Sequence, residues 1–145
     1  MDFVIEHPAH SPHYEYRKYD PHDKTTHRRA IYRFIVRSQP QPFMNTLDCA
    51  DASISVPKRD ETITALQALA LLNNRFMIAM SRSFAERLRS QADDLPGQIS
   101  LAYRQTTGRE PMSDETQLLS EYANQFGLAN TCRVLFNLNE FVFVD

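Results

Sequence analysis

Tryptophan is absent from this 145-residue chain, which also holds only three glycines and two cysteines. So few glycines disfavour a turn-rich β-sandwich or β-barrel, because tight turns between strands depend on glycine. No apolar run approaches the roughly 20 residues that a membrane-spanning helix needs. The start, MDFVIEHPAH, lacks the basic region and the long apolar region of a signal peptide. We therefore expect no membrane insertion and no signal peptide in this chain.

Motifs of common catalytic sites are also missing. The sequence contains no GxSxG, HExxH, Walker loop or dinucleotide-binding glycine pattern. Cys49 and Cys132 form no CxxC pair, which argues against cysteine-bound zinc and against haem attachment. We expect two buried free thiols, and a disulfide stays open if the chain works in an oxidising compartment. A pair of Cys49 with His13 or His27 also stays open, although a thiol needs an activating environment to react.

Residues 1–27 are expected to form a polar, extended arm that contains all five histidines and three of the eight prolines. Three of the histidines, His7, His10 and His13, suggest a zinc site. Glu6, Glu15 or Asp23 could complete the set of ligands. The interleaved prolines, however, prevent the helix that usually brings such ligands to one face. We predict a solvated or docked arm, with no metal and no cofactor.

Charge is distributed unevenly along the chain. Residues 1–92 hold 13 Lys and Arg against 10 Asp and Glu, whereas residues 93–145 hold 3 against 8. Neither part is basic enough to indicate nucleic-acid binding. The opposite signs suit head-to-tail self-association or packing of one half on the other, and two solvated surfaces would give the same pattern.

Residues 28–38, RRAIYRFIVRS, fit two structures. As a strand, apolar and arginine side chains alternate, and the β-branched and aromatic residues favour this prediction. As a helix, the arginines at positions 29, 33 and 37 form a row at four-residue spacing. Either arrangement could bind an anion or pair with acids of the protein itself.

A long connection with three prolines follows, and it carries Asp48 and Asp51. The two carboxylates are close enough to act as an acid pair, but turn-forming aspartates that accept bonds from local amides give the same spacing. The residues that we predict for a speculative ligand site are Arg33, Arg37, Asp48, Asp51 and Arg59.

The rest of the chain predicts helices, at residues 65–72, 75–91, 95–107, 114–126 and 128–138. Thr64 and Gln67 have the form of a capping box, which places a helix start at Ala65. Leu66, Leu69 and Leu72 give this helix a broad apolar face, and we expect that face to be buried. Asn73 suits a helix end in the left-handed conformation, and Asn74 suits the cap of the next helix.

Local signals place the other helix ends. Asp93 or Asp94 should cap the third helix and Ser113 the fourth, while Gly108 and Gly127 should end them. The expected core stripe of the fourth helix is Leu119, Tyr122, Ala123 and Phe126. The apolar tail NEFVFVD should add a short strand beside residues 30–36 or dock on the helices. The predicted fold is mainly α: a single domain over residues 28–145 with about five helices and, at most, one short two-stranded β element.

Four blocks of this chain read HRRAIYRFIVRSQPQPFMNTLDCADAS, KRDETITALQALALLNNRFM, AYRQTTGREP and LANTCRVLFNLNEFVFVD. In this order they resemble the C-terminal segment of a planctomycete domain of unknown function. The resemblance covers roughly residues 10 to 145. The matching positions are Arg28, Arg29, Tyr32, Arg37, Asp48, Asp51, Arg59, Gln67, Ala68, Leu69, Asn73, Gly108, Arg109, Pro111, Asn137 and Glu140.

In that family the domain follows a c-type cytochrome domain in large, generally exported proteins, so the resemblance implies that this chain corresponds to a fragment of one. It implies no activity. Our leading hypothesis is a non-enzymatic helical module that binds a protein partner or itself. The alternative is a ligand-binding or hydrolytic module for acidic or sulfated polysaccharide.

Overall fold

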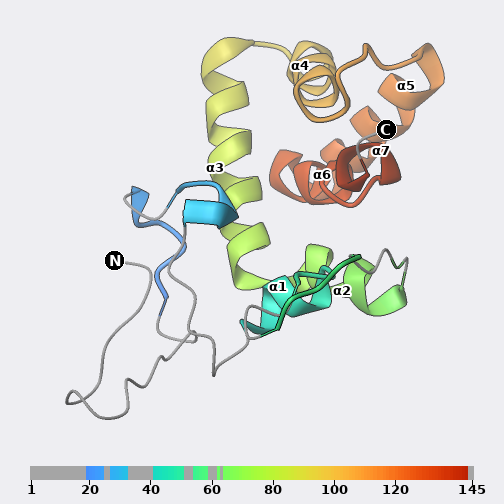
Figure 1. Ribbon diagram of the computed structural model, residues 1–145. Coiled ribbons are helices and arrows are strands. Elements are labelled where there is room, and N and C mark those ends of the chain that lie inside the picture. Colours follow the sequence, from blue (N-terminus) through green and yellow to red (C-terminus); the bar gives the residue numbers. More distant parts are fainter. Residues whose placement is uncertain are drawn as a thin grey trace. The chain divides into compact units, whose positions relative to one another are not determined.

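The computed structural model describes residues 19–24, 27–32, 41–50, 54–58, 62 and 64–143 (Figure 1). The described residues contain seven α-helices, a 3-10 turn and no strand, which confirms the mainly α prediction. The chain divides into two compact units, Met1–Ala70 and Leu71–Asp145. The α-helices are α1 (Pro42–Thr46), α2 (Ala65–Asn73), α3 (Arg75–Gln91), α4 (Leu95–Thr107), α5 (Ser113–Phe126), α6 (Leu128–Leu135) and α7 (Asn139–Val142).

In the first unit, the described part of the predicted strand is not extended. Ala30–Tyr32 forms the 3-10 turn η3, and the Tyr32 amide donates to the Arg29 carbonyl at 2.9 Å. The strand prediction is therefore wrong at these residues, because the backbone bonds within its own turn rather than to a neighbouring strand. Residues 33–38 lie outside the described part of the chain.

Helix α1 falls in the connection where no regular structure is predicted. Gln41 caps it with its side-chain oxygen, which accepts from the Met44 amide, and Pro42 occupies the first turn. At its other end, the amides of Asp48 and Cys49 donate to the carbonyls of Asn45 and Met44. These two bonds form a Schellman motif, with Asp48 in the left-handed position that glycine usually fills.

The start of α2 agrees with the sequence, whereas its end lies one residue later than predicted. The Gln67 amide donates to the Thr64 hydroxyl at 3.2 Å, and the Thr64 amide donates to the Gln67 side chain at 2.9 Å. Asn74 then caps α3 by accepting from the Phe76 amide. Asn73 is the last residue of α2, but its φ is not positive, because Asp48 is the only described non-glycine residue with a positive φ.

The predicted caps of α4 are confirmed. The Asp94 carboxylate accepts from the Gly97 amide, and Gly108 ends the helix at φ 80°, a conformation that glycine adopts at low cost. Helix α5 starts one residue earlier than predicted. Its start is fixed by Glu115, whose carboxylate reaches back to the Met112 amide at 2.8 Å, rather than by a Ser113 cap.

Gly127, at φ 85°, separates α5 from α6 as predicted. Helix α6 ends at Leu135 rather than at residue 138, because the amides of Asn137 and Leu138 bond within turns. The tail then forms the short helix α7 instead of a strand. Helix α7 packs on α4, which confirms the expectation that the tail docks on the helices.

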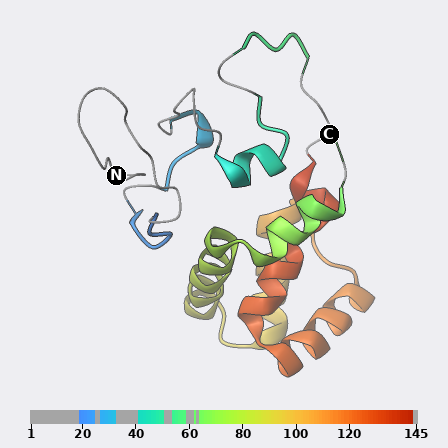
Figure 2. The same cartoon turned by 90° about the horizontal axis from the view of Figure 1, so that it is seen from below.

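The core of the second unit lies between α3, α4, α5 and α6. Figures 1 and 2 show α6 next to the long helix α3, and these two helices make the most extensive contact of this unit. The side chains of Leu88, Ile99 and Leu135 are fully buried there, as the helical periodicity predicts. Phe84 stacks on Phe136 at 5.5 Å between ring centroids, which joins α3 to the end of α6.

The predicted apolar face of α2 is the main correction to the expected core. Leu66 is 70% exposed and Leu69 is 55% exposed, whereas Leu71 is 7% exposed. Gln67, a polar residue, occupies a buried position on this helix instead. The physical reason is that hydrogen bonds of Gln67 set the rotation of α2, and these bonds turn the two leucines outward.

Candidate functional site

Of the five residues predicted for a ligand site, the structure describes Asp48 alone. Arg33, Arg37, Asp51 and Arg59 lie outside the described residues, so their grouping around a pocket stays a prediction.

The Asp48 carboxylate is bound by groups of its own chain. It accepts from the Thr62 amide at 2.7 Å, from the Thr62 hydroxyl at 2.8 and 2.9 Å, and from the Gln67 side-chain amide at 2.9 Å. The backbone and hydroxyl bonds from Thr62, followed by the bond from Gln67, lower the pKa of Asp48. These contacts stabilise the charged carboxylate and hold it against the start of α2.

Gln67 completes this cluster and has no unsatisfied polar atom. Its side-chain nitrogen donates to Asp48 and to the Thr62 hydroxyl, and its side-chain oxygen accepts from the Thr64 amide. A buried amide without these partners would be costly, so the cluster holds Gln67 inward. We call Asp48, Thr62, Thr64 and Gln67 the Asp48 cluster. Its arrangement joins the turn after α1 to the start of α2.

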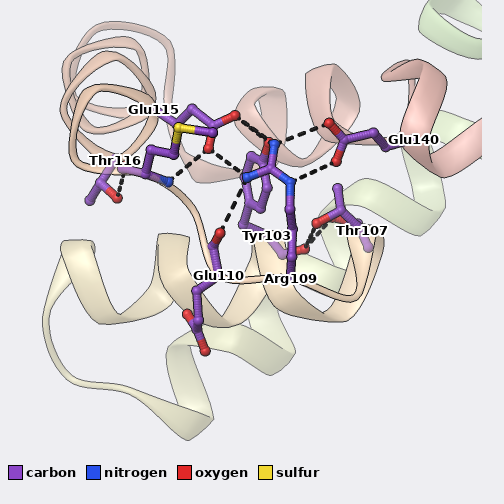
Figure 3. A network of polar contacts seen from close by, with 9 residues as sticks. Tyr103, Thr107, Arg109, Glu110, Glu115, Thr116 and Glu140 are labelled. Carbon is purple, nitrogen blue, oxygen red and sulfur yellow. Dashed lines mark hydrogen bonds and ion pairs between the residues drawn. The ribbon is translucent and has the colours of Figure 1, made fainter.

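A second polar network, in the other unit, is centred on Arg109 (Figure 3). Two nitrogens of Arg109 donate to the two oxygens of Glu115 at 2.8 and 2.9 Å, and two donate to those of Glu140 at 3.0 and 3.1 Å. The planar guanidinium suits such paired bonds to carboxylates. Arg109 lies in the loop after α4, Glu115 in the first turn of α5 and Glu140 in α7. One side chain therefore joins three elements.

Tyr103 packs against this network and bonds to it. Its ring lies under the guanidinium, with 4.7 Å from the Arg109 carbon to the ring centroid, and its hydroxyl donates to Glu115 at 2.6 Å. The Arg109 guanidinium also donates to the Tyr103 hydroxyl and to the Glu110 carbonyl. All five N–H groups of Arg109 thus have acceptors within the protein, which leaves none for an anionic ligand.

Electrostatics follow from this geometry. The bonds from Arg109, then those from the Tyr103 hydroxyl and the Met112 amide, lower the pKa of Glu115 to about 2. Burial, followed by the adjacent Glu115 carboxylate, raises the pKa of Tyr103 to about 12. The two glutamates raise the pKa of Arg109 above its ordinary value. Each group keeps its usual charge at neutral pH, so none is prepared for proton transfer there.

Local sequence patterns predict these two networks only in part. Thr64 and Gln67 were predicted as a capping box, but their link to Asp48 was not. Arg109 and Glu140 belong to the positions that carry the family resemblance, whereas Glu115 does not. The contacts that were not predicted join residues far apart in the sequence. Asp48 lies 14 residues from Thr62, and Arg109 lies 31 residues from Glu140.

The remaining candidate groups do not assemble a reactive site in the described residues. Cys49 and Cys132 are free thiols, and burial raises the pKa of Cys132 to about 12. The His27 ring bonds to the Pro21 carbonyl at 2.9 Å, while His7, His10 and His13 lie outside the described residues. No group of three metal-ligating side chains occurs in the described part. No helix there is long and apolar enough to cross a bilayer.

Comparison with known proteins gives one match. The sequence fits the family model PSD1, a protein of unknown function (DUF1553), over residues 3–123. No curated protein and no solved structure matches the chain. The matched span includes the Asp48 cluster and both Arg109 and Glu115, but not Glu140. Because the match covers most of the sequence, the chain belongs to the DUF1553 family of proteins of unknown function.

Proposed function

We propose that this chain is a non-enzymatic helical module that works by binding other protein surfaces. The observation that carries the proposal is the outward position of Leu66 and Leu69 on α2. These residues are three positions apart, so their side chains lie on the same side of the helix and form one patch. Helix α2, ALQALALLN, contains no charged residue that would keep this patch hydrated.

Burial of this patch by a partner is energetically favourable. Full burial of a leucine side chain is worth about 1.5–3 kcal/mol relative to exposure. Burial of the two leucines by a partner would therefore contribute a substantial part of the binding free energy. Exposed apolar patches on soluble proteins commonly mark such contacts. We call Leu66 and Leu69 the α2 patch.

The family resemblance supports a particular partner. The resembled planctomycete proteins carry a c-type cytochrome domain in the same polypeptide, so we propose that the α2 patch contacts a cytochrome-bearing part of such an assembly. In this role the chain would position the electron-carrying domain and leave the redox chemistry to it.

The contacts of Asp48 favour this function over a ligand-binding or hydrolytic one. A general acid or base, or a ligand-binding carboxylate, needs an oxygen that the substrate can reach. The oxygens of Asp48 accept from Thr62 and Gln67. The role of Asp48 in our proposal is to fix the start of α2 and thereby the direction in which the patch faces.

The test is a binding experiment with a purified c-type cytochrome domain from a planctomycete protein that carries this domain. The two proteins are mixed and separated by size exclusion, and the haem absorbance reports whether they migrate together. We expect a complex with the wild-type chain and loss of that complex with the double variant Leu66→Ser, Leu69→Ser. Leu118→Ser, on a different helix, is the matched control and should bind normally. Absence of a complex, or a complex that the double variant retains, would refute the proposal.

A further inference from the structure

Helix α5 carries a second apolar strip on its outer side. Leu118 is 65% exposed and Phe126 is 49% exposed, and the half-buried Tyr122 lies between them. The rings of Tyr122 and Phe126 contact each other at 4.7 Å between centroids. The helical periodicity predicts Phe126 in the core, and its exposure corrects that prediction. The core side of α5 is instead formed by Leu119 and Ala123.

The three side chains, which we call the α5 strip, are spaced four residues apart. At about 1.5 Å per residue they extend over about 12 Å, the length of roughly two helical turns. This spacing matches the side chains along one face of a partner helix, which recur every three or four residues.

Acidic side chains border the α5 strip. Asp114 and Glu121 are exposed on the same helix, and α5 contains no lysine or arginine. The third acid, Glu115, is neutralised by Arg109 at 2.8 Å. Residues 93–145 as a whole also carry a net negative charge. A partner surface next to the strip therefore has the most favourable electrostatic interaction with α5 if it is basic.

We propose that the α5 strip docks an amphipathic helix of another protein, with apolar residues on one face and lysine or arginine beside them. The strip would bury the apolar residues, and Asp114 and Glu121 would face the basic ones. Pairing of α5 with α5 of a second copy is disfavoured, because the same acids would then face each other. The inference rests on the proposed function as a protein-binding module, but it concerns a different surface from the α2 patch.

The test measures the fluorescence anisotropy of a labelled synthetic amphipathic helix made of leucine and lysine. The same helix with glutamate in place of lysine is the matched probe. We expect the lysine probe to bind the wild-type chain and the glutamate probe not to bind. The double variant Leu118→Ser, Phe126→Ser should weaken binding about tenfold or more, since apolar anchors dominate such contacts. Glu121→Lys should also weaken it and reduce its dependence on salt.

Two controls keep the test decisive. Circular dichroism and thermal melting of each variant must match the wild type, which is expected because these residues are exposed. Leu66→Ser, Leu69→Ser should bind the lysine probe normally, so a failure of the α2 patch is distinguishable from a failure of the α5 strip. The inference is overturned if neither probe binds, if both bind alike, or if the serine double variant retains full affinity. It is also overturned if the wild-type chain self-associates through Leu118.

Discussion

Arg109 and Glu115 form a two-bond ion pair, with nitrogen–oxygen distances of 2.8 and 2.9 Å, across the loop between α4 and α5. The same Glu115 carboxylate caps α5 by accepting from the Met112 amide. One acidic side chain thus fixes a helix start and positions the arginine that reaches Glu140 in α7. Because Glu115 serves both contacts, it should contribute more to stability than an isolated surface ion pair, which contributes little.

Replacing Arg109 should destabilise the second unit more than replacing another surface arginine. Arg109→Ala leaves Glu115 and Glu140 without their common partner and exposes the Tyr103 ring. We expect a melting temperature lowered by a few degrees and faster hydrogen exchange in α7. Arg104→Ala is the control, because Arg104 and its partner Glu110 are both more than half exposed. Equal melting temperatures for the two variants would contradict the role assigned to Arg109.

Acid should weaken the fold through Glu115. Its pKa is about 2 in the folded protein, below the ordinary value of 4.5. The ionised group therefore stabilises the fold fully above pH 4.5, and this contribution is lost as the pH falls from about 4.5 to about 2. Urea unfolding across this range should show a smaller fall in stability for Glu115→Gln than for the wild type. Glu121→Gln, on the exposed side of α5, should follow the wild-type curve, and a Glu115→Gln curve that also runs parallel to it would refute the prediction.

Asp48 should be needed for its carboxylate rather than for its backbone conformation. Asp48→Gly suits the left-handed position at φ 56° but removes the acceptor for Thr62 and Gln67. We expect faster amide exchange in the first turn of α2 for this variant. Asp48→Asn keeps one acceptor oxygen and tolerates the same φ, so its effect should be smaller. If Asp48→Gly exchanges as slowly as the wild type, the cluster does not fix the start of α2.

The neighbouring leucines of α2 should differ sharply in their effect on stability. Leu71→Ala removes a side chain that is 7% exposed and should cost about 2–5 kcal/mol of unfolding free energy. Leu66→Ala changes a residue that is 70% exposed and should stay within about 0.5 kcal/mol of the wild type. Chemical denaturation of both variants measures the difference. Similar losses would mean that the α2 patch is covered within the folded chain.

The two thiols should react at very different rates. Cys132 is fully buried, and its pKa of about 12 keeps it protonated at neutral pH, whereas Cys49 is partly exposed. A thiol reagent should therefore modify one cysteine per native chain and two in denaturant. Cys132→Ser should leave the native reaction unchanged, and Cys49→Ser should abolish it. Rapid native modification of Cys132 would contradict its burial.

Helix ends were predictable because their determinants are local. Asn74, Asp94, Gly108 and Gly127 act on amides or backbone angles within about four residues, so the sequence alone specifies them. The end of α6 was missed because the turns of Asn137 and Leu138 interrupt an apolar pattern that looks continuous. The periodicity of α3 and α4 also identified buried residues such as Leu88 and Ile99 correctly.

The sequence by itself determined the helical class, most helix boundaries and the core faces of the long helices, since these depend on contacts within a few residues and on regular spacing. Only the tertiary structure decided that α2 turns Leu66 and Leu69 outward, and that α5 does the same with Leu118 and Phe126. It also decided the pairing of Asp48 with Thr62 and of Arg109 with Glu140. The physical reason is that a helix rotates to satisfy its distant hydrogen bonds and packing partners together, and its own sequence does not contain those partners.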